Sequence, residues 1–215
     1  MRKTQFVNNE FYHIYNRGAD KRVIFPRSED FDRFLQSIEE FNNQEPIGSI
    51  FEHSFIKSKL GGQTTRLTRL VNIICYCLNP NHYHMILQQQ VNGGISEFMK
   101  RLGGYTRYVN IKYERSGVLF QGKFKAAHID SNEYLLRASA YVNLNNRVHR
   151  LHNNAFCSSW DEYIDRGGNN ICSKGVVLNQ FNNKSEYKSF AQEALRNILE
   201  HKQMAKELES TLLEK

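Results

Sequence analysis

Residues 71–90, with the sequence VNIICYCLNPNHYHMILQQQ, constrain the fold of this chain more than any other segment. Residues 71–78 form a nearly continuous apolar run rich in β-branched side chains, which predicts a buried strand. Residues 79–81, Asn-Pro-Asn, interrupt that run, because proline lacks a backbone donor and asparagine tolerates turn conformations. Residues 82–88 then alternate between the two faces of a second strand. We therefore expect two strands joined by a tight turn.

The second of these strands carries a candidate metal-binding pair. His82 and His84 share one face of the strand, whereas Tyr83, Met85 and Leu87 form an apolar opposite face. Two imidazoles spaced in this way can converge on one metal ion, and a rigid strand is suited to holding them. The spacing alone leaves a second interpretation open, in which both histidines are polar groups on a solvated face.

The chain has 215 residues and a formal net charge of +7, from 29 lysines and arginines against 22 aspartates and glutamates. This length suffices for one domain with a hydrophobic core, and the positive surplus favours a polyanionic partner such as nucleic acid. The four cysteines show no Cys-x-x-Cys spacing, and Cys75 and Cys77 are expected to be small buried residues. We identify no signal peptide and no apolar run of about 18 residues, so we expect a cytoplasmic protein without a membrane span.

The first part of the chain predicts one strand and one helix. Residues 10–16 have the composition of a strand that contains His13. We interpret His13 as a structural histidine, although it would reach the histidine pair if its strand neighboured residues 82–88. Ser28 is the expected N-cap of a helix that has apolar residues at helical spacing and ends before residues 42–43.

The middle of the chain is less regular. A short strand is expected within residues 47–56, followed by a basic loop at 57–69 that is either solvated or in contact with DNA. A helix is expected over residues 95–113, with one apolar and one basic face. Gly103 and Gly104 lie inside it and indicate a kink or a close backbone approach, because glycine weakens a helix by about 1 kcal/mol relative to alanine.

The last part of the chain predicts extended structure followed by helices. Residues 118–129 alternate loosely and indicate a strand or an extended segment. A helix is expected over residues 132–146, and a final amphipathic helix over 186–213. The intervening residues 147–185 are polar and irregular, with Trp160 as the expected anchor to the core.

The helix expected at residues 132–146 brings Tyr141 and Asn145 one turn apart on one face. If this face meets His82 and His84, two imidazoles and an amide oxygen form a three-ligand site with open positions. Such a donor set suits Mg²⁺ or Mn²⁺ better than Zn²⁺. The bound ion would polarise a phosphoryl oxygen, and Tyr141 would be the nucleophile that forms a covalent phosphotyrosine. If this helix face does not contact His82 and His84, Tyr141 is an ordinary core or surface residue.

Seven short motifs resemble, in sequence and in order, the single-tyrosine HUH transposases of the REP-associated group. They are YHIYNRG at 12–18, YCLNPNHYH at 76–84, YTRY at 105–108, GVLFQGKFK at 117–125, EYLL at 133–136, YVNLN at 141–145 and SSW at 158–160. The resemblance covers residues 5–165. It implies a transposase domain over residues 1–165, followed by a polar linker and an amphipathic helix over 166–215.

The resemblance implies an α+β fold with a ferredoxin-like antiparallel sheet backed by helices and a C-terminal helical extension. It also implies cleavage and rejoining of single-stranded, hairpin-flanked DNA through a 5′-phosphotyrosine, with release of a 3′-OH. His82 and His84 would be metal ligands, Asn145 the third ligand and Tyr141 the nucleophile, with Mg²⁺ or Mn²⁺ as cofactor. Asn146 departs from the many relatives that have proline there. Related proteins are either monomers or homodimers.

Basic and polar residues on the expected outer surfaces are candidate DNA contacts. They are Arg17, Lys100, Arg101, Arg107, Lys112, Gln121, Lys123 and Lys125. Two other functions remain open at this point. A DNA-binding protein of the same fold would need no chemistry. A hydrolase would need a carboxylate general base near the histidines, and residues 71–90 contain no acid.

Overall fold

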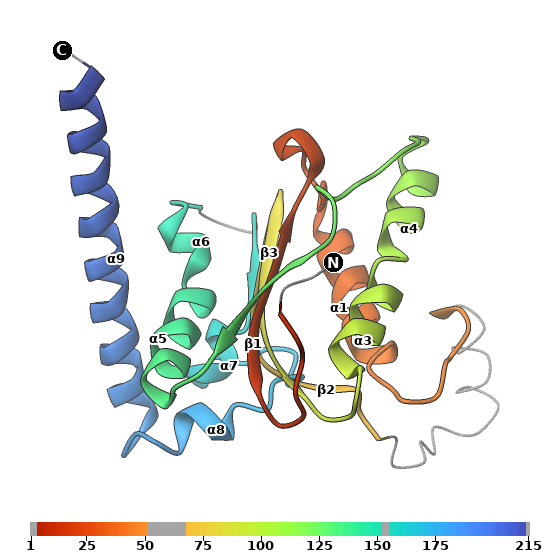
Figure 1. Ribbon diagram of the computed structural model, residues 1–215, viewed down its shortest axis with the longest axis horizontal. Helices are drawn as coiled ribbons and strands as arrows, with labels where there is room; N and C mark the ends of the chain where they lie inside the picture. Colours follow the sequence, from red (N-terminus) through yellow and green to blue (C-terminus); the bar gives the residue numbers. More distant parts are fainter. Residues whose placement is uncertain (1–3, 51–67, 152–154, 214–215) are drawn as a thin grey trace.

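The computed structural model describes residues 4–50, 68–151 and 155–213, with side chains described up to residue 204. A central antiparallel sheet has helices on both faces (Figure 1). Its strands are β1 (Phe11–Arg17), β2 (Val71–Asn79), β3 (His82–Gln89), β4 (Lys125–Ile129) and β5 (Cys157–Ser158). Among the described residues, none of the helices has the length and apolar character that a membrane span needs.

The strand order is β4-β1-β3-β2-β5, and every neighbouring pair is antiparallel. The first four strands and the helices between them follow the β-α-β-β-α-β order of a ferredoxin-like fold. The predicted α+β class and the predicted strand pair with its tight turn are therefore confirmed. Because β3 lies between β1 and β2, side chains on β3 are supported from both sides.

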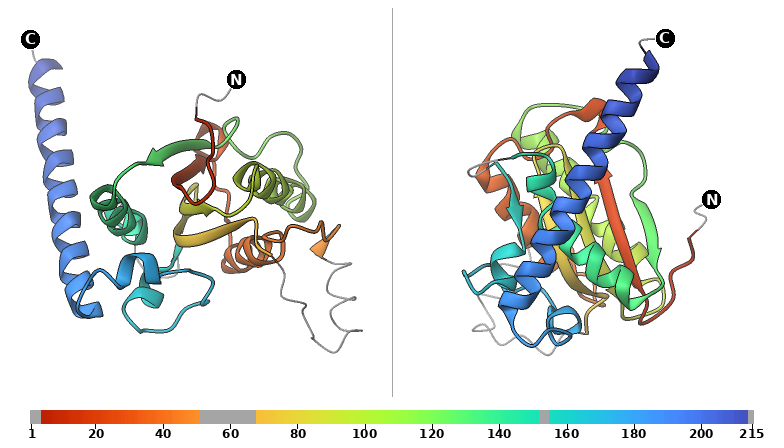
Figure 2. Two further views of the ribbon diagram at one scale, coloured as in Figure 1. Left: turned by 60° about the horizontal axis from the view of Figure 1, so that its bottom comes forward. Right: turned by 90° about the vertical axis from the view of Figure 1, so that its left-hand side faces the viewer.

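The two faces of the sheet bury different clusters. One face, with Ile14, Tyr83 and Met85, packs against α1 (Ser28–Glu40) and α3 (Gly94–Leu102). The other face carries Cys75, Cys77 and Ile86 and packs against α5 (Asn132–Asn143). Both cysteines are fully buried, as predicted. Figures 1 and 2 show α1, α3 and α4 (Tyr105–Lys112) on one side of the sheet and α5 and α9 (Lys184–Leu213) on the other.

The first helix begins one residue away from the prediction. Arg27, not Ser28, is the N-cap, and the Asp30 carboxylate accepts the backbone N–H of Arg27 at 2.9 Å. A first-turn acid can satisfy an orphan donor in this way, so the Ser28 hydroxyl is not needed. The helix ends as predicted, and the Asn42 side chain makes two hydrogen bonds with the backbone of Val71, which ties α1 to β2.

The helix predicted at residues 95–113 is divided into α3 and α4 at Gly103 and Gly104. Both glycines keep right-handed helical angles, but Gly104 N–H bonds to the carbonyl of Arg101 three residues earlier. A Cβ on Gly104 would lie 3.1 Å from the same carbonyl oxygen. The pair therefore permits a tight 3₁₀-like joint, which divides the predicted helix at the position where a kink or a close backbone approach was expected.

The strand predicted at residues 118–129 is confirmed only at its end. Only Lys125–Ile129 pairs as β4, and residues 118–124 are irregular apart from one bridge between Gly18 and Phe120. A single 3₁₀ turn, Ala19–Lys21, follows β1 and packs beside this segment. Of the strand predicted within 47–56, residues 47–50 are not extended in a sheet, and the rest lies outside the described residues. Most of the basic loop at 57–69 also lies outside them.

The C-terminal part is more ordered than predicted. After α5 the chain forms α6 (Asn145–Val148), β5, α7 (Trp160–Tyr163), α8 (Gly175–Leu178) and then α9, as predicted, close to residues 186–213. Trp160 is buried, as expected for an anchor. Val177 and Tyr187 are fully buried in the same cluster as Tyr163. Residues beyond the predicted domain boundary at 165 thus contribute to the core. Figure 2 shows the far end of α9 projecting beyond the rest of the molecule.

Candidate active site

The two histidines of β3 lie at the mouth of a cavity. His84 is opposite Tyr15 on β1 and Cys77 on β2, and His82 is opposite Arg17. Both histidines therefore lie on one face, as predicted. His84 is nearly buried, with 9% of its surface exposed. The cavity has a volume of about 390 Å³ and is lined by Tyr15, Asn16, Arg17, Lys21, Asn81, His82, His84, Gln121, Lys125 and His149.

Asn145 comes close to His82 through a break in the helix. Leu144 leaves helical geometry, so α5 ends and Asn145 begins the short helix α6. Asn145 is fully buried, and its Oδ1 lies 3.1 Å from His82 Nε2. The predicted single helix over 132–146 is therefore wrong in detail. The break nevertheless leaves Asn145 at the site.

The hydrogen-bond partners of His82 define which of its two ring nitrogens carries the proton. Nδ1 lies 2.7 Å from Asn81 Oδ1, which can only accept, so Nδ1 carries the proton. Nε2 then accepts from Asn79 Nδ2 at 2.9 Å. Asn79 Nδ2 also donates to Asn145 Oδ1 at 2.8 Å. His82 Nε2 and Asn145 Oδ1 are thus two acceptors that face each other.

Asn79 Nδ2 contacts both acceptors, so a cation shared by them would replace that donor. Two ligand atoms at right angles around an ion, each about 2.1 Å from it, are about 3 Å apart. The separation of His82 Nε2 and Asn145 Oδ1 matches that value. In the described part of the chain, no three His, Cys, Asp or Glu side chains form a metal-binding group. Asn145 Oδ1 is an amide oxygen that lies next to His82 Nε2, at 3.1 Å.

Tyr141 lies next to the histidines. Its ring meets the His84 ring edge to face, with centroids 5.5 Å apart. Burial raises the pKa of the Tyr141 hydroxyl, and a hydrogen bond with Asn145 opposes that rise only partly. The phenol is therefore protonated at neutral pH. A nucleophilic role would require the proton to leave during the reaction.

His13 lies at the site, contrary to its interpretation as a purely structural residue. Because β1 pairs with β3, His13 Nε2 lies 2.8 Å from His84 Nδ1. Burial lowers the pKa of His13 to about 4. Sequence reasoning could have placed it only by knowing which strands are neighbours.

His149 and Lys202 were not predicted from the sequence. His149 follows α6, and its ring centroid is 4.5 Å from that of His82. Burial, with smaller contributions from His82 and Lys202, lowers the pKa of His149 to about 4. Burial also lowers the pKa of His82, opposed by Asn145 and assisted by Lys202. For His84, burial is the largest cause of a pKa well below the ordinary value. All of these imidazoles are therefore neutral at pH 7, the form in which a histidine binds a metal.

Three of the candidate DNA contacts belong to this cavity. Arg17, Gln121 and Lys125 line it, and the Arg17 guanidinium donates to the Gln121 side-chain oxygen. Lys21 adds a cation that the sequence did not indicate. Among the described residues that line the cavity, none is acidic. The cavity is therefore positive and suits phosphate groups.

Three other candidates lie elsewhere. Lys100 and Lys123 line a smaller pocket of about 200 Å³, and Asn16 lies on the boundary between that pocket and the cavity. Arg107 lines a groove beside α1 and α4, on the sheet face opposite the histidines. Any DNA contact of Arg107 would thus be separate from the cavity.

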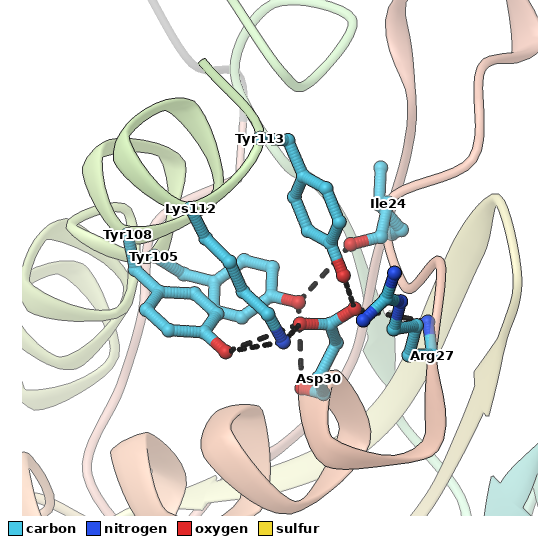
Figure 3. Close-up of polar contacts among 7 residues, drawn as sticks. All are labelled: Ile24, Arg27, Asp30, Tyr105, Tyr108, Lys112 and Tyr113. Carbon is cyan, nitrogen blue, oxygen red and sulfur yellow. Dashed lines mark hydrogen bonds and ion pairs between the residues drawn. The ribbon is translucent and has the colours of Figure 1, made fainter. Parts of the chain in front are cut away.

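The last two candidates have partners within the fold. Arg101 pairs with Glu97 at 2.8 Å and donates to the carbonyl of Asn43. Lys112 Nζ lies 2.7 Å from a carboxylate oxygen of the fully buried Asp30 (Figure 3). The basic helix face of the sequence analysis is therefore partly structural. Arg101 and Lys112 hold segments together, and their contact with DNA stays a prediction.

Comparison with known proteins supports the family resemblance. Residues 63–145 match the family described as "Transposase IS200 like". The fold is similar to that of a REP-associated tyrosine transposase solved with a bound REP hairpin, with a TM-score of 0.51 and 13% sequence identity. That match covers 80% of this chain and 88% of the other. The curated proteins contain no match to the chain.

The matched segment contains β2, β3, α5 and the first residue of α6, and with them both histidines, Tyr141 and Asn145. The resemblance to REP-associated tyrosine transposases is thus confirmed by a family match and by a shared fold. Residues 63–145 are thus similar to the IS200-like transposases.

Proposed function

We propose that this protein is a metal-dependent transposase that cleaves and rejoins single-stranded DNA through a covalent bond to Tyr141. One arrangement of side chains supports the proposal most. The Tyr141 ring contacts the His84 ring, and His82 Nε2 lies 3.1 Å from Asn145 Oδ1. These residues come from β3, α5 and α6, and the two histidines among them line a cavity with three cations.

In the proposed step, Tyr141 Oη attacks the phosphorus of a phosphodiester. A Tyr–O–P bond forms, the bond from phosphorus to the 3′-oxygen breaks, and the phenol proton ends on the departing 3′-OH. His82, His84 and Asn145 would hold Mg²⁺ or Mn²⁺, which supplies Lewis-acid stabilisation of the phosphoryl charge. Rejoining is the reverse step with a new 3′-OH, and the phosphotyrosine conserves the energy of the broken bond.

The proposed substrate is an unpaired DNA segment beside a hairpin. The similar solved structure holds a REP hairpin, and the positive cavity of this chain suits a phosphate chain that passes the histidines. Arg17, Lys21 and Lys125 lie where they would contact phosphates on that path. Phosphate contacts position a strand without reading its sequence.

The test is incubation of the protein with labelled hairpin oligonucleotides from DNA that flanks the gene, with Mn²⁺, with Mg²⁺ or with a chelator. A denaturing protein gel should show a covalent protein–DNA band that needs the metal. Tight binding without any band, for every oligonucleotide, would instead support a non-catalytic DNA-binding protein.

A metal-dependent hydrolase is less well supported. Such an enzyme needs a general base to activate water, commonly a carboxylate. The described residues that line the cavity include no Asp or Glu. A hydrolase would also release free 5′-phosphate or 3′-phosphate ends without a protein-linked product, so the same gel distinguishes the two enzymes.

Affinity for single-stranded DNA should depend steeply on salt, and part of that dependence should come from the cavity. Replacing Arg17 or Lys125 by Gln should reduce the slope of log K against log salt by about 1 each, because one phosphate contact is lost. Fluorescence anisotropy between 50 and about 300 mM salt measures the slope.

Arg137→Gln is the matched control for this measurement. Arg137 is 70% exposed on α5, pairs with Glu133 and is not among the residues that line the cavity. Its removal should leave the slope unchanged. Equal slopes for the wild type and the cavity variants would contradict a phosphate path through the cavity.

A further inference from the structure

His84 has a close polar neighbour in His13. His13 Nε2 lies 2.8 Å from His84 Nδ1, which is a hydrogen bond between two ring nitrogens. The two rings are nearly parallel, at 23°, with centroids 5.0 Å apart. The antiparallel pairing of β1 with β3 fixes this contact, because His13 is opposite Ile86 and Tyr15 is opposite His84. The contact is thus set by the sheet and not by a loop.

A neutral imidazole carries one proton, so only one of these two rings can donate. If His13 donates, His84 must carry its own proton on Nε2, and that nitrogen cannot bind a cation. If His84 donates from Nδ1, its Nε2 has a free lone pair. The direction of one hydrogen bond therefore decides whether His84 can be a ligand.

His82, the other candidate ligand on β3, has the second of these two arrangements, with its proton on Nδ1. Asn81 accepts from Nδ1 of His82, which leaves Nε2 of His82 as an acceptor facing Asn145. Asn81 lies in the tight turn, whereas His13 comes from another strand, so two separate segments contact the two Nδ1 atoms. A metal-binding histidine commonly donates its other N–H to such a partner, which also orients the ring.

We propose that His13 is a positioning residue that accepts the Nδ1 proton of His84 and thereby keeps Nε2 of His84 free for the metal ion. This inference rests on the proposed function, because a free lone pair on His84 Nε2 matters only if a metal ion binds there. His13 itself touches neither the ion nor the DNA. Tyr15 and Tyr141 also contact the His84 ring through their own rings, and none of the described residues that line the cavity is a carboxylate that could replace His13.

The direct test is the tautomer of His84 in the metal-free protein, read from ¹⁵N–¹H correlation spectra of histidine side chains. In the wild type, His84 should carry its proton on Nδ1. In His13→Leu, which removes the acceptor, the proton should move to Nε2, the form that an unconstrained imidazole favours. In His13→Gln, the side-chain oxygen can accept, so the wild-type form should return.

The second measurement is the affinity for Mn²⁺, followed by the electron paramagnetic resonance signal of the free ion. His13→Leu should weaken Mn²⁺ binding about 10-fold or more, as is typical when an outer partner of a ligand is lost. His13→Gln should recover most of that loss. His128→Gln is the control, because His128 lies on the neighbouring strand β4, is 43% exposed and pairs with Glu10.

Two results would overturn the inference. One is a wild-type His84 with its proton on Nε2. The other is a His13→Leu variant that folds with the wild-type melting temperature and keeps both the tautomer and the Mn²⁺ affinity. If His84→Ala leaves Mn²⁺ binding unchanged, the proposed metal site fails instead, while the metal-free spectra still decide the role of His13.

Discussion

Replacing Tyr141 by phenylalanine is expected to abolish the covalent protein–DNA product while leaving DNA binding intact. The phenol oxygen is the atom that bonds to phosphorus in the proposed step, and no other group can substitute for it in place. Loss of a nucleophile commonly lowers a rate by about 10³-fold or more. The ring itself should still pack against His84. The measurement is the yield of the metal-dependent adduct on a denaturing gel, beside the binding affinity from fluorescence anisotropy.

Tyr134→Phe is the matched control for this result. Tyr134 lies on the same helix, α5, and is 39% exposed. Its loss should change neither the adduct nor the affinity. An adduct that persists in Tyr141→Phe would show that another residue is the nucleophile. A loss of both adduct and binding would point to a folding defect, which the melting temperature would reveal.

The central strand pair and its histidines were predictable because their signals are local. The apolar run, the Asn-Pro-Asn break and the alternation that follows lie within twenty consecutive residues, and the strand period alone determines which side chains share a face. The motif order then indicated the fold and brought in Tyr141 and Asn145. The structure adds that Asn145 reaches His82 across a helix break at Leu144, which the helical spacing did not predict.

The remaining features depend on contacts between distant segments. His13 could be placed beside His84 only from the strand order β1-β3, which no local pattern contains. Lys112 had the appearance of a solvent-facing helix residue, because its partner Asp30 precedes it by 82 positions. The same reasoning explains why Arg101 was assigned to a DNA surface. A basic helix face indicates a solvated or anion-binding surface only where no buried acid or carbonyl meets it.

Replacing Asp30 by asparagine is expected to lower the free energy of unfolding by about 3 kcal/mol, because it leaves a buried polar cluster without its charge. Asp30 is fully buried and joins α1 to α4 (Figure 3). One carboxylate oxygen accepts from Lys112 at 2.7 Å and Tyr108 at 3.1 Å, and the other accepts from Tyr113 and the backbone N–H of Arg27. The asparagine side chain has an NH2 group in place of one carboxylate oxygen. That group is a hydrogen-bond donor, so it would face some of these N–H and O–H groups with another donor. Urea unfolding followed by tryptophan fluorescence and circular dichroism measures the change.

Asp32→Asn is the control for this variant. Asp32 lies on the same helix but is exposed, and its loss should cost no more than about 0.5 kcal/mol. Equal effects of the two substitutions would contradict a special role for Asp30. The face of the sheet that carries His82 and His84 is on the other side, so the Asp30 variant should keep adduct formation at temperatures where it remains folded.

The same carboxylate should make stability depend on pH. Burial raises the pKa of Asp30, but hydrogen bonds from Lys112, Tyr113 and the Arg27 backbone lower it more, so the folded-state pKa lies below the ordinary value. A depressed pKa means that the unfolded chain binds this proton more readily. The stabilisation is therefore complete above the unfolded-state pKa of about 4 and is lost as the pH falls through the lower folded-state value. The difference in urea midpoint between the wild type and Asp30→Asn should therefore narrow as the pH falls from 7 toward about 3, because the contribution of the charged carboxylate is being lost. A difference between them that stays constant across this range would mean that Asp30 acts through packing and not through its charge.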